Sequence, residues 1–149
     1  MPYLFSYGTF RSPYVQKRLF GNTVPTEPAA LTGYAVYAGR DGYHGLLPCE
    51  GAVVNGGLLM LTDREMKIAD GWEICPTLYF RREAEVRTVD GSVFAWIYFR
   101  TDSGALGLRI EDDTLLFTLS QEQLDRELDK YREELEASGL LPFPSSPCL

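Results

Sequence analysis

The segment between residues 78 and 100 constrains the fold more than any other part of the chain. Residues 78–87 and 92–100 are rich in aromatic and β-branched side chains, and Asp90-Gly91 between them is a strong signal for a hairpin turn. In the second segment both faces are apolar, with Phe94, Trp96 and Tyr98 alternating with Val93, Ala95, Ile97 and Phe99. Because such a strand requires cover on both sides, we expect it to be central and buried in the sheet.

Three further strands are predicted by short apolar segments. They span residues 2–7, 31–38 and 52–61, and residues 23–28 form a connector. The strand at 52–61 contains the glycine-rich tripeptide 55–57, where we expect either a bulge or the close approach of another backbone segment.

Capping residues mark the starts of three helices. A serine N-cap followed by proline predicts a short helix over residues 13–20. Capping-box patterns at Thr62 and Ser120 predict a second helix that ends near Gly71 and a long third helix that ends at Gly139. The long helix has one apolar side, formed by Leu124, Leu128, Tyr131 and Leu135.

The other segments after residue 100 differ in composition from the core. Residues 101–113 are typical of a loop, and residues 114–119 indicate one more strand. Between residues 121 and 137 seven acidic side chains accompany three basic ones, which we interpret as the solvated face of the long helix. The tail at 140–149 contains three prolines, and we expect it to lie over the surface or to be disordered.

These elements amount to five or six short strands, two short helices and one long helix. Strands of this spacing with antiparallel hairpins predict a small antiparallel-rich β-barrel with flanking helices and a C-terminal helix, in the α+β class. The 149 residues are enough for one domain with a buried core. We therefore predict a single domain over residues 1–149, with its core at about 3–100 and a C-terminal extension at about 101–149.

Composition excludes several functional classes. The chain has 14 Lys and Arg against 21 Asp and Glu, a net charge of −7, which argues against a nucleic-acid or anionic-membrane partner. No apolar run reaches the roughly 18 residues of a membrane span, and the N-terminus lacks the pattern of a signal peptide. Three widely spaced cysteines and one histidine leave no structural zinc site. An odd number of cysteines without a signal peptide favours the cytoplasm. The oligomeric state stays open.

The sequence lacks the common catalytic motifs. A Ser-His-Asp or Cys-His arrangement would have to use His44, the single histidine, which we expect to be an exposed residue of a glycine-flanked turn. No nucleophile elbow, Walker loop or dinucleotide fingerprint is present. A mechanism that needs no metal or other cofactor and relies on one carboxylate is what remains.

Two segments are candidates for such chemistry. Residues 7–10, Tyr-Gly-Thr-Phe, connect a strand to a helix, and their backbone N–H groups can hold an anion, although a plain turn has the same spacing. Glu73 follows the second helix, where the helix dipole disfavours a negative charge and apolar neighbours raise the pKa. It is therefore a candidate general base, and the alternative is an exposed loop glutamate. Asp70 is a weaker candidate of the same kind.

Several motifs together resemble the γ-glutamyl cyclotransferase-like family over about residues 3–99. In chain order they are Tyr7-Gly8-Thr9-Phe10, residues 42–48, Gly56-Gly57-Leu58-Leu59, Ala69-Asp70-Gly71-Trp72-Glu73 and Tyr79-Phe80-Arg81. Two departures concern the site: Phe10 replaces the usual leucine, and Ile74 stands where glycine commonly follows the glutamate. The last fifty residues have no counterpart in the compact members of the family.

The resemblance implies a β-barrel enzyme without a cofactor. In the implied reaction, the α-amine of a γ-glutamyl amide attacks its own γ-carbonyl, and 5-oxoproline and a free amine are released. Glu73 would be the general acid and base, and Tyr7, Gly8, Thr9, Phe10 and Tyr79 would bind the substrate. The form of the Tyr-Gly-Thr-Phe motif favours the γ-glutamylamine branch over glutathione-related substrates. For Tyr79 a core aromatic with its hydroxyl at the pocket rim is an equally good interpretation.

Two other functional classes remain open at this point. The chain could be a non-enzymatic binding or regulatory protein that keeps this fold and holds a small ligand. It could also be a thiol enzyme that uses Cys75 beside Glu73. The second alternative is weak, because the only cations near Cys75 in the sequence are Arg81 and Arg82, His44 is distant, and a buried inert thiol is more common.

Overall fold

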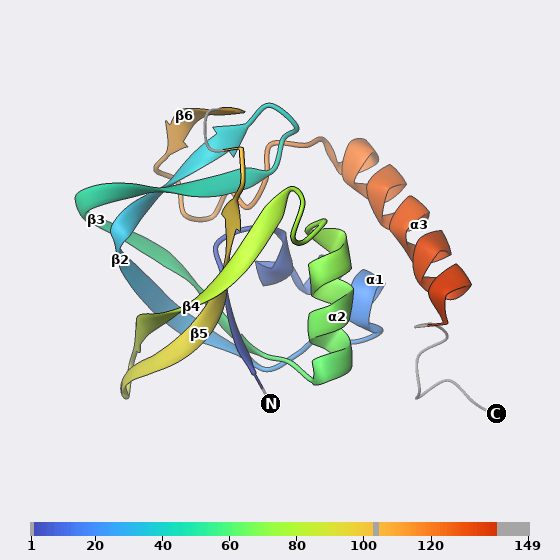
Figure 1. The fold of residues 1–149 in the computed structure, drawn as a ribbon, viewed down its shortest axis with the longest axis horizontal. Coiled ribbons are helices and arrows are strands. Elements are labelled where there is room, and N and C mark those ends of the chain that lie inside the picture. Colours follow the sequence, from blue (N-terminus) through green and yellow to red (C-terminus); the bar gives the residue numbers. More distant parts are fainter. Residues whose placement is uncertain (1, 103–104, 140–149) are drawn as a thin grey trace.

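Five strands close into a barrel in the computed structural model, which describes residues 2–102 and 105–139. The strands are β1 (Tyr3–Ser6), β2 (Thr26–Gly39), β3 (His44–Met60), β4 (Tyr79–Thr88) and β5 (Gly91–Arg100). Their order is β3-β1-β5-β4-β2, and β2 also pairs with β3, which completes the ring (Figure 1). β1 is antiparallel to β3 and parallel to β5, so the barrel is mixed. The predicted fold class, a small antiparallel-rich barrel with flanking helices, is confirmed.

The predicted hairpin forms the centre of the sheet. β4 and β5 pair from Tyr79↔Arg100 to Thr88↔Gly91, and β5 lies between β1 and β4. One face of β5 places Ala95, Ile97 and Phe99 in the barrel interior, and the other places Tyr98 in the cluster beneath the helices. Phe94, next to the turn, is 65% exposed, so the prediction of two buried faces holds for the second half of the strand only.

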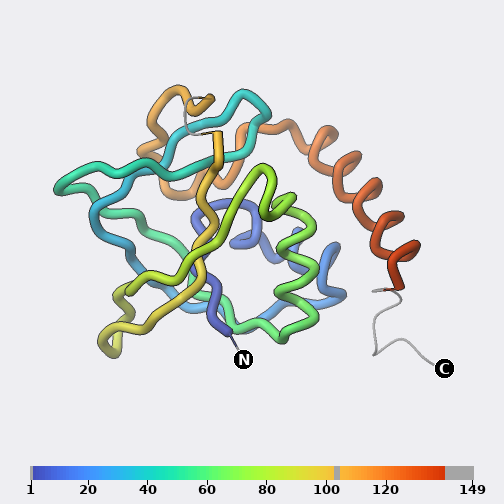
Figure 2. Tube along the Cα trace, viewed as in Figure 1, coloured from blue at the N-terminus to red at the C-terminus, as the bar shows by residue number. Residues whose placement is uncertain are grey.

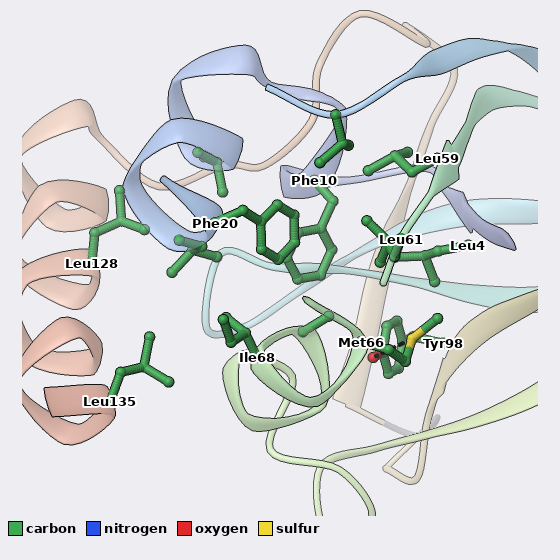
Figure 3. Packing of buried hydrophobic residues seen from close by; sticks show 14 of the residues in the cluster. Leu4, Phe10, Phe20, Leu59, Leu61, Met66, Ile68, Tyr98, Leu128 and Leu135 are labelled. Carbon is green, nitrogen blue, oxygen red and sulfur yellow. Dashed lines mark hydrogen bonds between the residues drawn. The ribbon is translucent and has the colours of Figure 1, made fainter. Parts of the chain in front are cut away.

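All three predicted helices form, namely α1 (Pro13–Phe20), α2 (Asp63–Trp72) and α3 (Gln121–Ser138). The Ser12 side chain accepts from the Val15 N–H, and both capping boxes are complete. The helices lie together beside the barrel, with α3 outermost (Figure 1). Leu128 and Leu135 of α3 point toward α1 and α2, where Phe20 and Ile68 belong to the same apolar cluster (Figure 3). No helix in the described ranges is both long and apolar enough to cross a membrane.

A glycine allows α3 to dock on α2. The Tyr131 hydroxyl donates to the backbone carbonyl of Ile68 at 2.7 Å. A Cβ atom at Gly71 would lie 2.1 Å from this hydroxyl oxygen. Because that separation is far below van der Waals contact, the chain can bring α3 this close only if residue 71 lacks a side chain.

We expect Gly71→Ala to lower the free energy of unfolding by about 1–3 kcal/mol, because Tyr131 must move. Without this contact, alanine inside a helix would stabilise the protein by about 1 kcal/mol relative to glycine. Urea unfolding measures the difference. In a Tyr131→Phe background, which lacks the clashing hydroxyl, the same substitution should cost less. An equal cost in both backgrounds would contradict this explanation.

The β2–β3 hairpin is longer than predicted. The expected connector at 23–28 was wrong from Thr26 onward, because Thr26 pairs with Leu59 and Pro28 with Gly57 in a regular ladder. The tripeptide 55–57 lies in this ladder without a bulge, and the close approach is realised instead: a Cβ at Gly56 would lie 2.5 Å from the Ser6 carbonyl oxygen. The register shift lies between Thr32 and Tyr34.

Two predictions after residue 100 were wrong. The expected loop at 101–113 contains β6 (Leu106–Ile110), which pairs with the outer half of β2, and the expected strand at 114–119 is irregular. β6 is an edge strand in which no residue is buried, and Leu108 is 83% exposed. Burial therefore does not select the side chains from which a strand is predicted. The expectation for the tail at 140–149 lies outside the described residues.

Candidate active site

Glu73 stands at the end of α2, where the chain leaves the helix. It is the C-cap residue, and its N–H donates to the Ala69 carbonyl at 3.0 Å. The next residue, Ile74, has φ +52°, a left-handed conformation that β-branched residues rarely adopt. Isoleucine therefore takes a backbone conformation that favours glycine, the residue common at this point in the family that the motifs resemble. Cys75 and Pro76 follow, joined by a cis peptide bond.

Glu73 lies where two cavities meet. The smaller, about 30 Å³, is lined by residues 4–10 and by His44, Tyr98 and Leu116. The larger, about 470 Å³, is lined by Asp41, the end of α2 and one side of α3. Tyr43, Glu73 and Tyr79 line both. Figure 2 shows the turn before β3, the chain between α2 and β4 and the start of α3 close to one another, and residues from all three line the larger cavity.

The pKa of Glu73 is raised to about 8, mainly by burial, while the charge of Arg100 lowers it and the charges of Asp41 and Asp70 raise it. The predicted direction of the shift agrees with this value. The expectation that apolar neighbours shield the carboxyl fails for Ile74, which is 55% exposed. A carboxyl group with this pKa can both accept and return a proton near neutral pH.

The stability of the protein should fall as pH rises from about 4.5 to about 8, compared with Glu73→Gln. The ordinary pKa of Glu73 is 4.5 and its folded pKa is about 8, so the folded state binds more protons than the unfolded state in this window. Urea unfolding at one-unit pH steps measures the difference between the two proteins, and contributions from other groups cancel. A difference that does not change with pH would show that Glu73 is not shifted.

Asp70, the weaker candidate, has a structural role. Arg81 donates to both of its carboxylate oxygens at 2.7 and 3.1 Å, and the Tyr98 hydroxyl donates to one of them at 2.6 Å. These bonds tie α2 to β4 and β5. A carboxylate held by three donors is poorly placed to act as a general base, because both of its oxygens are already engaged.

Arg100 is a site residue that the sequence did not reveal. Its side chain is 3% exposed and donates to both oxygens of Asp41 at 3.0 Å and to Asp102 at 2.7 and 2.9 Å. It also lies over the Tyr79 ring at 5.1 Å. The only sequence signal was an arginine at the end of an apolar strand with an aspartate two residues later. The arginine anchors the turn before β3 to the end of β5.

The predicted substrate-binding residues at 7–10 all line the smaller cavity. The Tyr7 hydroxyl donates to the Tyr98 carbonyl at 2.6 Å, and the Phe10 ring stacks on Phe20 at 5.9 Å, so both side chains belong to the core. The Gly8 N–H lies 3.4 Å from the Ser6 hydroxyl. Thr9 accepts a hydrogen bond from the Trp72 indole at 3.3 Å, which links this loop to the end of α2.

Tyr79 combines the two interpretations that the sequence left open. It is 3% exposed, as a core aromatic is, and it also lines both cavities. Its hydroxyl donates to the His44 carbonyl at 2.6 Å and accepts from Arg100 at 3.4 Å. Burial and the nearby charge of Glu73 raise the pKa of Tyr79, so the hydroxyl keeps its proton.

The prediction that His44 is an exposed turn residue was wrong. The turn ends at Tyr43, whose carbonyl accepts from the Gly39 N–H at 2.8 Å, and His44 is the first residue of β3, paired with Ala38. Its side chain shares the inner face with Leu46, because alternate residues of a strand point the same way, and it is 4% exposed. Burial lowers its pKa, so the imidazole is neutral near pH 7.

Cys75 has no activated thiol. Burial and the charge of Asp70 raise its pKa, which is the opposite of what a nucleophilic cysteine requires. Within residues 2–102 and 105–139, His, Cys, Asp and Glu side chains form no group of three that could bind a metal.

Comparison with known proteins extends the motif resemblance. The sequence matches the family described as gamma-glutamyl cyclotransferase, AIG2-like, over residues 4–115. No curated protein matches the chain. A solution structure of an Arabidopsis thaliana protein is 23% identical, with a TM-score of 0.61, and covers 91% of this chain and 87% of that one.

Two further solved structures are similar. One, described as gamma-glutamyl cyclotransferase, is 14% identical with a TM-score of 0.60 and covers 99% of this chain and 92% of that one. The other, an AIG2-like protein from Mus musculus, is 19% identical with a TM-score of 0.59 and covers 81% and 97%. These identities establish a common fold only. The family match covers most of the chain, so the protein belongs to the gamma-glutamyl cyclotransferase, AIG2-like family.

Proposed function

We propose that the protein is a γ-glutamyl cyclotransferase that releases 5-oxoproline and a free amine from a γ-glutamyl amide. The observation that carries the proposal is the position of Glu73, a carboxyl group with a pKa of about 8 at the junction of a small cavity and a larger pocket. Such a group can serve one proton transfer in each direction, which is what this reaction needs.

In the proposed reaction Glu73 takes a proton from the α-amine of the substrate as the amine nitrogen attacks the γ-carbonyl carbon. The new C–N bond closes the five-membered ring, and the carbonyl electron pair moves to oxygen. When the carbonyl re-forms, the bond to the leaving nitrogen breaks, and Glu73 returns the proton to that nitrogen. Backbone N–H groups of residues 9 and 10 would stabilise the oxyanion, and a substrate held in its folded conformer gains up to about 7–11 kcal/mol.

The two cavities suit the two halves of such a substrate. The smaller cavity, on the Tyr7–Phe10 side of Glu73, would hold the carboxylate end of the γ-glutamyl group, and the larger one would hold the amine. Aromatic rings line the larger cavity next to Glu73: the centroid of the Trp72 ring lies 6.0 Å from that of Tyr43 and 5.8 Å from that of Tyr131. Aromatic faces bind the apolar or cationic part of an organic amine, so we propose a γ-glutamylamine as the substrate class. We also propose that the protein is located in the cytoplasm.

The test is a panel of γ-glutamyl compounds incubated with the protein and followed by mass spectrometry. The panel contains γ-glutamyl-ε-lysine, γ-glutamyl monoamines and glutathione-derived dipeptides. We expect 5-oxoproline from the amine members, in amounts equal to the released amine. Release from the dipeptides alone would overturn the substrate class, and no release from any member would favour a binding protein of the same fold.

A further inference from the structure

His44 is the one histidine of the chain, and its environment is unusual for a core residue. It is 4% exposed, and neither ring nitrogen has a hydrogen-bond partner among the residues that the structure describes. Buried polar side chains are nearly always hydrogen-bonded, since leaving one unpaired costs the free energy of its lost hydration. A buried imidazole with two unpaired nitrogens therefore needs an explanation, and a ligand is a direct one.

The position of His44 indicates which ligand. It lines the small cavity together with Glu73 and the loop at residues 7–10. Several other polar side chains there are already paired: Tyr7 donates to the Tyr98 carbonyl, and Thr9 accepts from Trp72. Among the described residues, the imidazole is the one side chain whose polar atoms are fully buried and have no partner, so both of its nitrogens are left for a bound molecule.

The surroundings hold His44 in place. Its carbonyl accepts from the Tyr79 hydroxyl at 2.6 Å, and the residue pairs with Ala38 in the sheet. A neutral imidazole carries one N–H donor and one acceptor nitrogen. The amino-acid end of a γ-glutamyl group offers the complementary pair, a carboxylate that accepts and an amine that donates. The cavity volume of about 30 Å³ suits a group as small as a carboxylate.

We propose that His44 is a substrate-binding residue whose ring N–H donates a hydrogen bond to the α-carboxylate of the γ-glutamyl group. This inference rests on the proposed function. It leaves the backbone N–H groups of residues 9 and 10 for the oxyanion, and it keeps the α-amine on the same side of the substrate as Glu73. His44 takes no part in the proton transfers.

The histidine ring can be observed directly, because a protein with one histidine gives one pair of ring ¹⁵N resonances. We expect these resonances to shift when 5-oxoproline is added, and to shift little with pyrrolidin-2-one, the same lactam without the carboxylate. Binding of 5-oxoproline is followed independently by calorimetry. Equal shifts with both compounds, or calorimetric binding without a shift, would overturn the proposal for His44 while leaving the proposed function in place.

Two variants complete the test. We expect His44→Phe, which fills a similar volume without polar atoms, to keep or raise the midpoint of urea unfolding and to raise KM about 10- to 100-fold, with kcat changed less than about threefold. His44→Gln keeps a donor, and we expect it to recover part of the lost affinity. An unchanged KM in a folded His44→Phe protein would overturn the proposal. An absence of both turnover and 5-oxoproline binding in the wild type would instead overturn the proposed function, and this inference with it.

Discussion

Glu73→Gln is expected to abolish turnover and leave the fold intact. Glutamine has nearly the shape of glutamate but cannot accept the proton of the α-amine, so we expect kcat to fall by about 10²- to 10⁴-fold. The variant should also be more stable than the wild type at pH 8, because it does not place a charge in the partly closed cavity beside Asp41 and Asp70. Loss of activity together with gain of stability distinguishes a removed base from a damaged fold.

The measurement is steady-state release of 5-oxoproline from the best substrate of the panel, with urea unfolding of the same preparations. Glu133→Gln is the matched control, since Glu133 is an exposed residue on α3 and lines neither cavity beside Glu73. The control should keep wild-type turnover and stability. If Glu73→Gln kept most of its turnover, Glu73 would not be the acid and base.

Arg100→Met is expected to lower the free energy of unfolding by about 2–4 kcal/mol. The substitution leaves Asp41 and Asp102 without the guanidinium that pairs with both of them from a buried position. The cost stays below that of a fully buried pair, because the two carboxylate side chains are 36% and 42% exposed and water can reach them. Loss of the positive charge should also raise the pKa of Glu73 above about 8.

Urea unfolding measures the stability of Arg100→Met, and its pH dependence relative to an Arg100→Met, Glu73→Gln double variant reports the pKa of Glu73. Arg100→Lys is the informative control, because it keeps the positive charge but not the planar guanidinium group. We therefore expect an intermediate stability and a smaller change in the pKa of Glu73. Arg109→Met, on an exposed side chain, should change little. Equal stability of Arg100→Met and the wild type would show that these ion pairs do not hold the turn before β3.

Much of the fold could be predicted because its signals are local. Ser12, Thr62 and Ser120 cap helices through bonds to residues three positions away, and these bonds depend on sequence spacing alone. The β4–β5 hairpin is similarly local. β6 and the first residues of β2 escaped prediction because their partners lie far away in the sequence, and cross-strand pairing there overrides a weak intrinsic preference.

The candidate site likewise contains some residues that the local sequence reveals and others that it does not. Glu73 could be found because a helix end and its apolar neighbours act on it within a few residues, whereas Arg100 meets Asp41 across 59 positions. His44 was misjudged because its flanking glycines indicate a turn. The residue instead begins β3, and the segments that bury its ring, residues 4–10 among them, lie far away in the sequence.

The sequence by itself determined which segments become helices and hairpins and which carboxylate stands at a helix end, because capping and alternation act over a few residues. Only the tertiary structure decided that His44 is buried, that Arg100 neutralises two aspartates and that α3 closes a cavity over Glu73. Burial and the field of distant charges depend on every element that surrounds a side chain, and barrel closure brings those elements together.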